Sequence, residues 1–127
     1  MKNLLMNFPH CNEFQDSSFI GIWHEESLFD IDRYWELEKD IFDLAKENHS
    51  NDIPRDIAWP ITRIFSYIMM SIQAHYSSND GFELLNITDS ELHNFRERFQ
   101  CVVEGFFEGV MPLNESFEIV NPLIKNT

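Results

Sequence analysis

The chain has 127 residues, of which 43% are hydrophobic, and its 22 acidic and nine basic side chains give a formal net charge of −13. This length suits one domain, over residues 1–127, and the apolar fraction excludes a disordered tail. Because a strongly negative protein repels phosphate backbones and anionic lipid, the charge argues against a general nucleic-acid-binding or membrane-surface protein and favours a basic protein partner.

Residues 1–29 show no clear helical period, and one apolar run within them, residues 19–23 (FIGIW), predicts a short strand. The first nine residues contain too short an apolar core for a signal peptide, and no later run approaches the roughly 18 residues of a membrane helix. We therefore expect a cytoplasmic protein in which Cys11 and Cys101 are reduced and mostly buried.

A first long helix is predicted over residues 31–48. Tyr34, Leu37 and Ile41 recur there at helical spacing, and charged residues fill most of the other positions. This pattern is typical of an amphipathic helix at the surface of a domain. The polar run at residues 49–52 is expected to end this helix and to supply the start signal of the next.

The second predicted helix is nearly uncharged. The side of it that includes Arg63 and Met70 is only weakly polar, and Pro60 should kink any continuous helix that contains it. Because a helix that is apolar almost all round belongs inside a domain, we expect residues 60–76 to form the central core element. Its apolar stripe consists of Ile57, Ile61, Ile64, Phe65, Ile68, Ile72 and Tyr76.

The third predicted helix has the clearest signals. Thr88 and Glu91 have the spacing of a capping box at its start, and Gly109 is expected to end it. Its apolar positions recur with a helical period: Leu92, Phe95, Phe99, Val102, Val103, Phe106 and Val110.

Shorter segments surround this helix. Residues 77–81 have the composition of a turn, residues 83–87 are expected to be extended, and the alternation in residues 117–120 predicts another extended piece. The fold class predicted from these elements is mostly α. We expect a single-domain helical bundle of three main helices, with short extended or β segments near the termini.

No motif predicts catalysis, a cofactor or a metal site. His24 and Glu25 resemble the start of a zinc-protease motif, but Leu28 stands where its second histidine would be. Cys101 is expected to be a small core residue, and His75 a hydrogen-bonded residue at the edge of the core. We therefore predict a protein that is not an enzyme.

Arg63 lies in the nearly uncharged block, as does Arg55. A buried guanidinium without a partner would destabilise the fold by several kcal/mol, so a buried Arg63 would need an acidic partner. We interpret it as one half of an internal salt bridge whose other half the sequence does not identify.

Acidic and aromatic side chains are concentrated before that block, where residues 25–47 carry a net charge of −6. One interpretation is a solvated helix face that keeps the protein soluble. The other is a docking surface, on which acids accelerate the encounter with a basic partner and aromatic rings supply contact energy. The candidate binding residues are Glu25, Glu26, Asp30, Asp32, Glu36, Asp40, Asp43, Glu47 and Trp35.

Several short strings, spread in order through nearly the whole chain, resemble the bacterial immunity proteins of polymorphic-toxin and contact-dependent growth inhibition systems. The likeness is greatest to the immunity forty-one family. The strings are residues 7–11 (NFPHC), 18–21 (SFIG), 34–37 (YWEL), 53–60 (IPRDIAWP), 64–67 (IFSY), 79–81 (NDG), 95–99 (FRERF) and 121–123 (NPL).

The resemblance implies a small cytosolic protein that binds and neutralises the toxin domain encoded beside it, by stoichiometric occlusion. Because nucleases need a basic surface for phosphate, the acidic charge favours a basic nuclease as the toxin, a ribonuclease first. Two alternatives stay open: an acidic adaptor or DNA mimic that binds a basic host protein, and a small enzyme assembled from scattered residues such as His24, Glu25 and His75.

Overall fold

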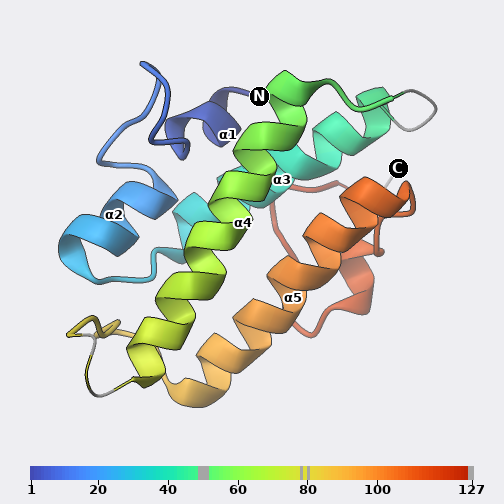
Figure 1. Ribbon diagram of the computed structural model, residues 1–127. Coiled ribbons are helices and arrows are strands. Elements are labelled where there is room, and N and C mark those ends of the chain that lie inside the picture. The colour runs from blue at the N-terminus through green and yellow to red at the C-terminus, as the bar shows by residue number, and fades with distance from the viewer. Residues whose placement is uncertain (49–51, 78, 80, 126–127) are drawn as a thin grey trace.

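The computed structural model describes residues 1–48, 52–77, 79 and 81–125, and within these ranges the chain forms five α-helices and no strand (Figure 1). The predicted breaks at 49–52 and 77–81 fall partly on residues 49–51, 78 and 80, which lie outside the described residues. In chain order the elements are α1 Lys2–Met6, α2 Phe19–Glu26, α3 Ile31–Asn48, α4 Arg55–Tyr76, α5 Asp89–Glu108 and the 3₁₀ helix η1 Asn114–Ser116. The mostly α prediction is confirmed.

The run at residues 19–23 forms part of the helix α2, so the predicted strand is wrong, and with it the prediction of three main helices. The Ser18 hydroxyl accepts a hydrogen bond from the Gly21 N–H at 3.0 Å. The buried Asn7 side chain accepts another, from the Ile20 N–H at 2.8 Å. A five-residue apolar run suits a buried strand or a buried helix, and these two caps decide in favour of the helix.

The helix α3 lies behind α4 in the view of Figure 1 and packs against α1, α2 and α5. Its bounds agree with the prediction, and eight of its 18 residues are buried, as expected for an amphipathic helix that buries one face. Two of the eight are acidic, Glu38 and Asp40. The helix is therefore amphipathic, as expected, although its buried face includes two charged side chains.

The helix α4 continues through Pro60 but is buried on one side only. Trp59, Met70 and Tyr76 are each more than half exposed, so residues 60–76 are not the central core element. The helix α4 lies across the front of the molecule (Figure 1). The prediction equated the absence of charge with burial, whereas these uncharged side chains are exposed. Its buried stripe consists of Ile61, Ile64, Ile68 and Ile72.

The helix α5 begins and ends where its local signals predict. The Thr88 hydroxyl accepts a hydrogen bond from the Glu91 N–H at 3.1 Å, and the Glu91 carboxylate accepts one from the Thr88 N–H at 2.9 Å. Hydrogen bonds from Thr88 to the Glu91 carboxylate, first of all the one from the Thr88 backbone, lower the pKa of Glu91. Gly109 ends the helix with a φ of 92°, a left-handed conformation that favours glycine.

The two segments predicted to be extended, residues 83–87 and 117–120, do not form strands. Side-chain hydrogen bonds instead hold the segment that follows α5, residues 110–125, which we call the C-terminal tail. The buried Asn114 accepts a bond from the Asn121 N–H at 2.9 Å, and the Asn121 amide donates to the Trp35 carbonyl at 3.1 Å. Hydrogen bonds of this kind between distant residues cannot be recognised from an alternating pattern in the sequence.

Three single-residue predictions have mixed outcomes. Cys101 is exposed and Cys11 half-buried, so the expectation of buried thiols is wrong, although both thiols are free. Arg63 is half-buried and donates to His10 at 3.3 Å, and no acid within the described residues pairs with it. His75 is confirmed as a hydrogen-bonded residue at the core edge, where it accepts the Leu84 N–H at 3.0 Å.

The buried ion pair joins α3 to α5 and involves Arg98, a residue the sequence did not single out. Two nitrogens of its guanidinium donate to the two carboxylate oxygens of Glu38, at 2.7 and 2.8 Å. Glu38 is fully buried and also accepts the Tyr34 hydroxyl at 2.6 Å. The sequence predicted an internal salt bridge at Arg63, whereas the structure has one at Arg98.

We expect Arg98→Ala to lower the free energy of unfolding by about 3–5 kcal/mol, because Glu38 would stay buried without a countercharge. Urea denaturation followed by circular dichroism measures this loss. The matched control is Arg96→Ala, a half-buried arginine of the same helix, which should change stability by about 0.5 kcal/mol or less. Equal losses in both variants would contradict a specific role for the pair.

Candidate functional site

Two of the nine predicted binding residues are buried, Asp40 and Trp35, which are 8% and 6% exposed. The Asp40 carboxylate accepts the Leu4 N–H at 3.0 Å and lies 2.8 Å from the N-terminal amine of Met1. Asp40 therefore holds α1 against α3. Its charge is used inside the protein, so Asp40 is not available to a partner.

Two further candidates, Glu36 and Asp43, are half-buried and already have basic neighbours on α3. Arg33 lies 3.1 Å from Glu36, and Lys39 lies 2.6 Å from Asp43. Pairs of this kind along an exposed helix face contribute little to stability. They do reduce the net charge that this part of α3 presents to a partner.

The remaining candidates lie at the two ends of α3. Glu25, Glu26, Asp30 and Asp32 follow one another from the last turn of α2 to the first turn of α3, and all but the half-buried Asp30 are exposed. Glu47 is also exposed, but it lies about 22 Å farther along the helix axis than Asp32. The structure thus brings four of the predicted acids to one junction and separates Glu47 from them.

A groove of about 480 Å³ lies beside this junction, between the first halves of α3 and α5 and the C-terminal tail. We call it the aromatic groove. The predicted binding residue Trp35 is part of its lining, and Asp30 and Asp32 lie on either side of the lining residue Ile31. The lining residues are Phe29, Ile31, Tyr34, Trp35, Asn86, Ile87, Glu91, Asn94, Phe95, Arg98, Phe117, Glu118 and Ile119.

Closely packed rings form the floor of the aromatic groove. The Phe95 ring meets Phe29 edge-on at a centroid distance of 4.8 Å and Tyr34 edge-on at 4.9 Å. Tyr34 also contacts Trp35 at 5.6 Å. Tyr34, Trp35 and Phe95 are themselves almost completely buried, so these rings form a rigid support beneath the groove.

A side-chain clamp fixes one end of the groove. The Asn86 carbonyl accepts the Phe29 N–H at 2.7 Å, and the Asn86 amide donates to the Phe29 carbonyl at 2.9 Å. The pair imitates a short stretch of strand pairing between the α2–α3 and α4–α5 connections. It holds Phe29 against the aromatic floor.

Arg98 lies within the groove but adds no free positive charge there. Its guanidinium lies 4.7 Å from the centre of the Trp35 ring and 4.2 Å from that of Phe117, and it also donates to the Ile119 carbonyl. Burial lowers the pKa of Arg98, but the hydrogen bonds and charge of Glu38 outweigh that effect and raise it overall. The guanidinium therefore stays charged and links the tail to both helices.

The half of this site that comes from α5 and the tail was not predicted from the sequence. Glu91 and Glu118 are exposed acids of the lining, and Ile119 is 65% exposed at its edge. A signal did exist, because residues 76–127 carry the same net charge of −6 as residues 25–47. Nothing in that signal indicated that the two segments meet in space.

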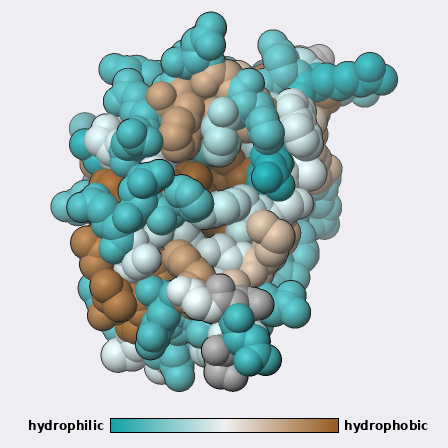
Figure 2. Space-filling model, turned by 60° about the vertical axis from the view of Figure 1, so that its left-hand side comes forward, coloured by the Kyte–Doolittle hydropathy of each residue, from teal (hydrophilic) through white to brown (hydrophobic). Residues whose placement is uncertain are grey.

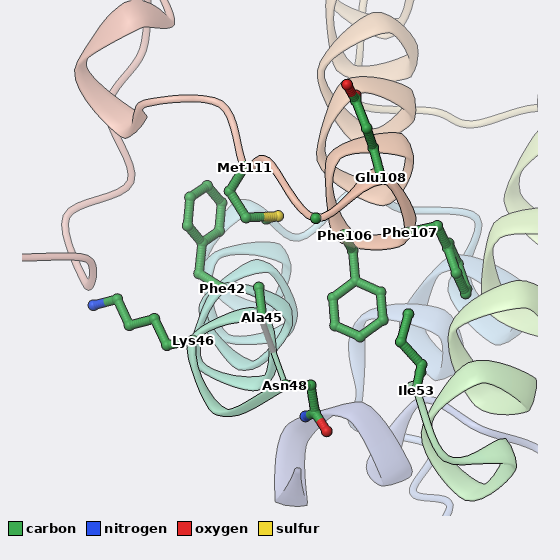
Figure 3. Close-up of a pocket in the computed structure, with 10 residues that line it drawn as sticks. Phe42, Ala45, Lys46, Asn48, Ile53, Phe106, Phe107, Glu108 and Met111 are labelled. Carbon is green, nitrogen blue, oxygen red and sulfur yellow. The ribbon is translucent and has the colours of Figure 1, made fainter. Parts of the chain in front are cut away.

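A second cavity, of about 580 Å³, lies at the opposite ends of α3 and α5 (Figure 3). Phe42, Phe106 and Met111 turn toward it, whereas the charged groups of Lys46 and Glu108 turn away (Figure 3). Its interior is therefore apolar and, unlike the aromatic groove, it does not combine acids with aromatic rings.

The residues of the enzymatic alternative are not assembled into one site. His24 lies 2.9 Å from the Tyr67 hydroxyl, whereas His75 bonds to the Leu84 backbone. Tyr67 and His75 are eight residues apart on α4, about 12 Å along its axis. Within the described residues, no group of three or more His, Cys, Asp or Glu side chains has the arrangement of a metal site.

The outer surface is mostly hydrophilic on the side that carries α1 and α2, with separate hydrophobic patches between the polar groups (Figure 2). None of the helices in the described part of the chain combines the length and apolar character that crossing a bilayer requires.

Comparison with known families gives a match over residues 6–117 to the family described as Immunity protein 41. The matched region contains α2 to α5 and all of the aromatic groove except Glu118 and Ile119. Searches among curated proteins and among solved structures found no match.

The geometry of the groove floor predicts a dependence of stability on pH. Burial, and then the charge of Glu38, raise the pKa of Tyr34 well above its ordinary value of 10.0. Because the folded-state pKa is raised, the contribution of Tyr34 is complete below about pH 10 and is lost as the pH rises above that value. Tyr34→Phe removes both the hydrogen bond and this ionisation.

We expect wild type to exceed Tyr34→Phe in unfolding free energy by about 1–3 kcal/mol at neutral pH, and this difference to shrink above about pH 10. Urea denaturation of both proteins across this range measures it. Tyr76→Phe, at an exposed position, should show no such convergence. A constant difference between wild type and Tyr34→Phe would contradict the buried, un-ionised state of Tyr34.

Proposed function

The chain belongs to the Immunity protein 41 family, and on that basis we propose that it binds and neutralises the toxin domain encoded beside it. We place this action in the bacterial cytoplasm, within a polymorphic-toxin or contact-dependent growth inhibition system. The toxin is proposed to be a nuclease with a basic surface, a ribonuclease first. Inhibition needs no chemistry of the immunity protein itself, because a tightly bound protein blocks access to the toxin.

The observation that carries the proposal is an aromatic groove bordered by acids, on a protein of net charge −13. A nuclease must attract phosphate backbones, so the surface around its active cleft is positive. An inhibitor that covers such a surface benefits from opposite charge, which accelerates the encounter and disfavours other partners. The acids supply this attraction, and the groove offers an apolar side chain of the partner a place to be buried.

The binding mode we propose places an apolar side chain of the toxin, flanked by Lys or Arg, in the aromatic groove. The exposed side chains of Ile31 and Ile119 form its apolar edges, at 42% and 65% exposure. The acids of the rim, Asp32, Glu91 and Glu118, would face the flanking basic residues. Most of the binding energy would come from the buried centre of such an interface, and the rim charges would set the association rate.

The direct test is rescue. Cells that express the adjacent toxin domain should die alone and survive when this chain is co-expressed, and the two proteins should co-purify as a stoichiometric complex. In unprotected cells, RNA should be degraded while DNA stays intact. If co-expressing cells die although the chain is soluble, the immunity proposal is refuted. If they survive but RNA stays intact in cells that express the toxin alone, only the ribonuclease assignment is refuted.

A charge-reversal pair tests the groove. Asp32→Lys with Glu118→Lys reverses two exposed acids beside the groove and changes the net charge from −13 to −9. We expect the association rate with the toxin domain to fall about tenfold at low salt, because the local attraction is lost. Stopped-flow or surface-binding kinetics at several salt concentrations measure this change.

The matched control is Glu47→Lys with Glu108→Lys, which changes the net charge equally at the opposite ends of α3 and α5. This pair should slow association much less. Equal slowing by the two pairs would mean that only total charge matters, and no slowing by either would remove the groove rim from the interface.

A further inference from the structure

The helix α4 presents a solvent-exposed stripe without acidic residues, and the toxin-binding proposal does not use it. No Asp or Glu occurs between Asp56 and Asp80, although the chain contains 22 acids. Within this stretch Trp59 and Met70 are 51% and 59% exposed. Large exposed side chains on an uncharged surface are typical of protein–protein interfaces.

The stripe has a symmetric spacing. Its exposed members Trp59, Thr62, Ser66, Met70 and Gln73 are separated by three, four, four and three residues, so they lie on one side of the helix. Read from either end, the pattern of spacings is the same, with Ser66 at its centre. In a twofold interface each residue i meets a residue j of the other copy and j meets i, and this spacing places the members of the stripe at such paired positions about Ser66.

The groups that border the stripe toward α1 and α2 already have partners. Arg63 donates to His10, whose ring stacks on Trp59 with centroids 6.0 Å apart. Farther along, the Tyr67 hydroxyl lies 2.9 Å from His24. The polar border of the stripe is therefore satisfied within the chain. Trp59 packs on His10 and Phe8 within the chain and still exposes half of its surface.

We propose that this stripe is a dimer interface, in which the α4 helices of two copies pack antiparallel about a twofold axis through Ser66. In that arrangement Trp59 of each copy faces Gln73 of the other, and Thr62 faces Met70. The small Ser66 side chains at the crossing let the helices approach closely, and Met70 lies near the partner's Trp59 for a sulfur–aromatic contact.

Charge favours a second copy over the toxin as the occupant. Two molecules of net charge −13 repel each other, and the repulsion is smaller when they meet through α4, whose residues 57–76 include no acid, than through the acidic rim of the groove. A basic toxin gains more from the acidic rim of the aromatic groove than from this stripe. The dimer proposal does not depend on the proposed toxin, because it needs no other protein.

The size of the stripe sets the strength of the dimer. A helix of 22 residues is about 33 Å long, so one helix pair with its borders falls at the small end of specific interfaces. We therefore expect a reversible dimer whose fraction depends on concentration. Salt should strengthen it, since screening reduces the repulsion between the two acidic bodies.

Sedimentation equilibrium of the whole chain, at about 0.05 M and about 0.5 M salt, tests the proposal. Dimer should increase with protein concentration and with salt. Ser66→Glu, which brings two carboxylates together at the axis, should abolish it. Ser90→Glu, an equal charge change at an exposed position on α5, should leave it intact. A monomer under all conditions, or equal effects of the two variants, would overturn the proposal.

Disulfide trapping tests the axis itself. In a Cys101→Ser background, Ser66→Cys should form a covalent dimer on mild oxidation, because the two thiols meet at the crossing. Gln73→Cys, farther from the axis, should not. Efficient trapping at Gln73→Cys alone would overturn the antiparallel arrangement. Weaker toxin binding by Ser66→Glu without any change in oligomeric state would assign the stripe to the toxin instead.

Discussion

The buried pair of Glu38 and Arg98 is the constraint on which the arrangement of this molecule depends. A carboxylate with no exposed surface is tolerated only when charge and hydrogen bonds surround it, and Glu38 receives them from Arg98, Tyr34 and Asn121. These three donors come from α5, α3 and the tail. Satisfying one buried charge therefore fixes how α5 lies on α3 and where the tail crosses them, and the aromatic groove lies between these three parts.

Local signals predicted the long helices well. The bounds of α3 and α5 agree with the periodicity and the capping box, because hydrogen bonds within a few residues decide them. The helix α2 was missed because one of its caps is Asn7, 13 residues before the N–H that it accepts. The ion pair was missed for the same reason, since Glu38 and Arg98 are 60 residues apart and neither differs from its neighbours in the sequence.

Charge counting located the candidate site only in part. It identified a segment of net charge −6 but not which of its acids remain free on the surface. Glu38 and Asp40 are buried. Glu36 and Asp43 lie beside basic residues. The groove draws its other acids from the second −6 segment. Which acids remain available to a partner depends on tertiary packing, and a linear sequence of one chain contains no direct record of that packing.

The uncharged stripe of α4 and the acidic groove are consistent with one physical requirement. A protein that presents strong negative charge to a basic partner also repels its own copies, so self-association needs a separate face without acids. The helix α4 supplies such a face, whereas the groove is built from α3, α5 and the tail. Because the two surfaces share no residue, a dimer formed through α4 would use none of the side chains that line the groove, and a partner in the groove would use none of the α4 stripe.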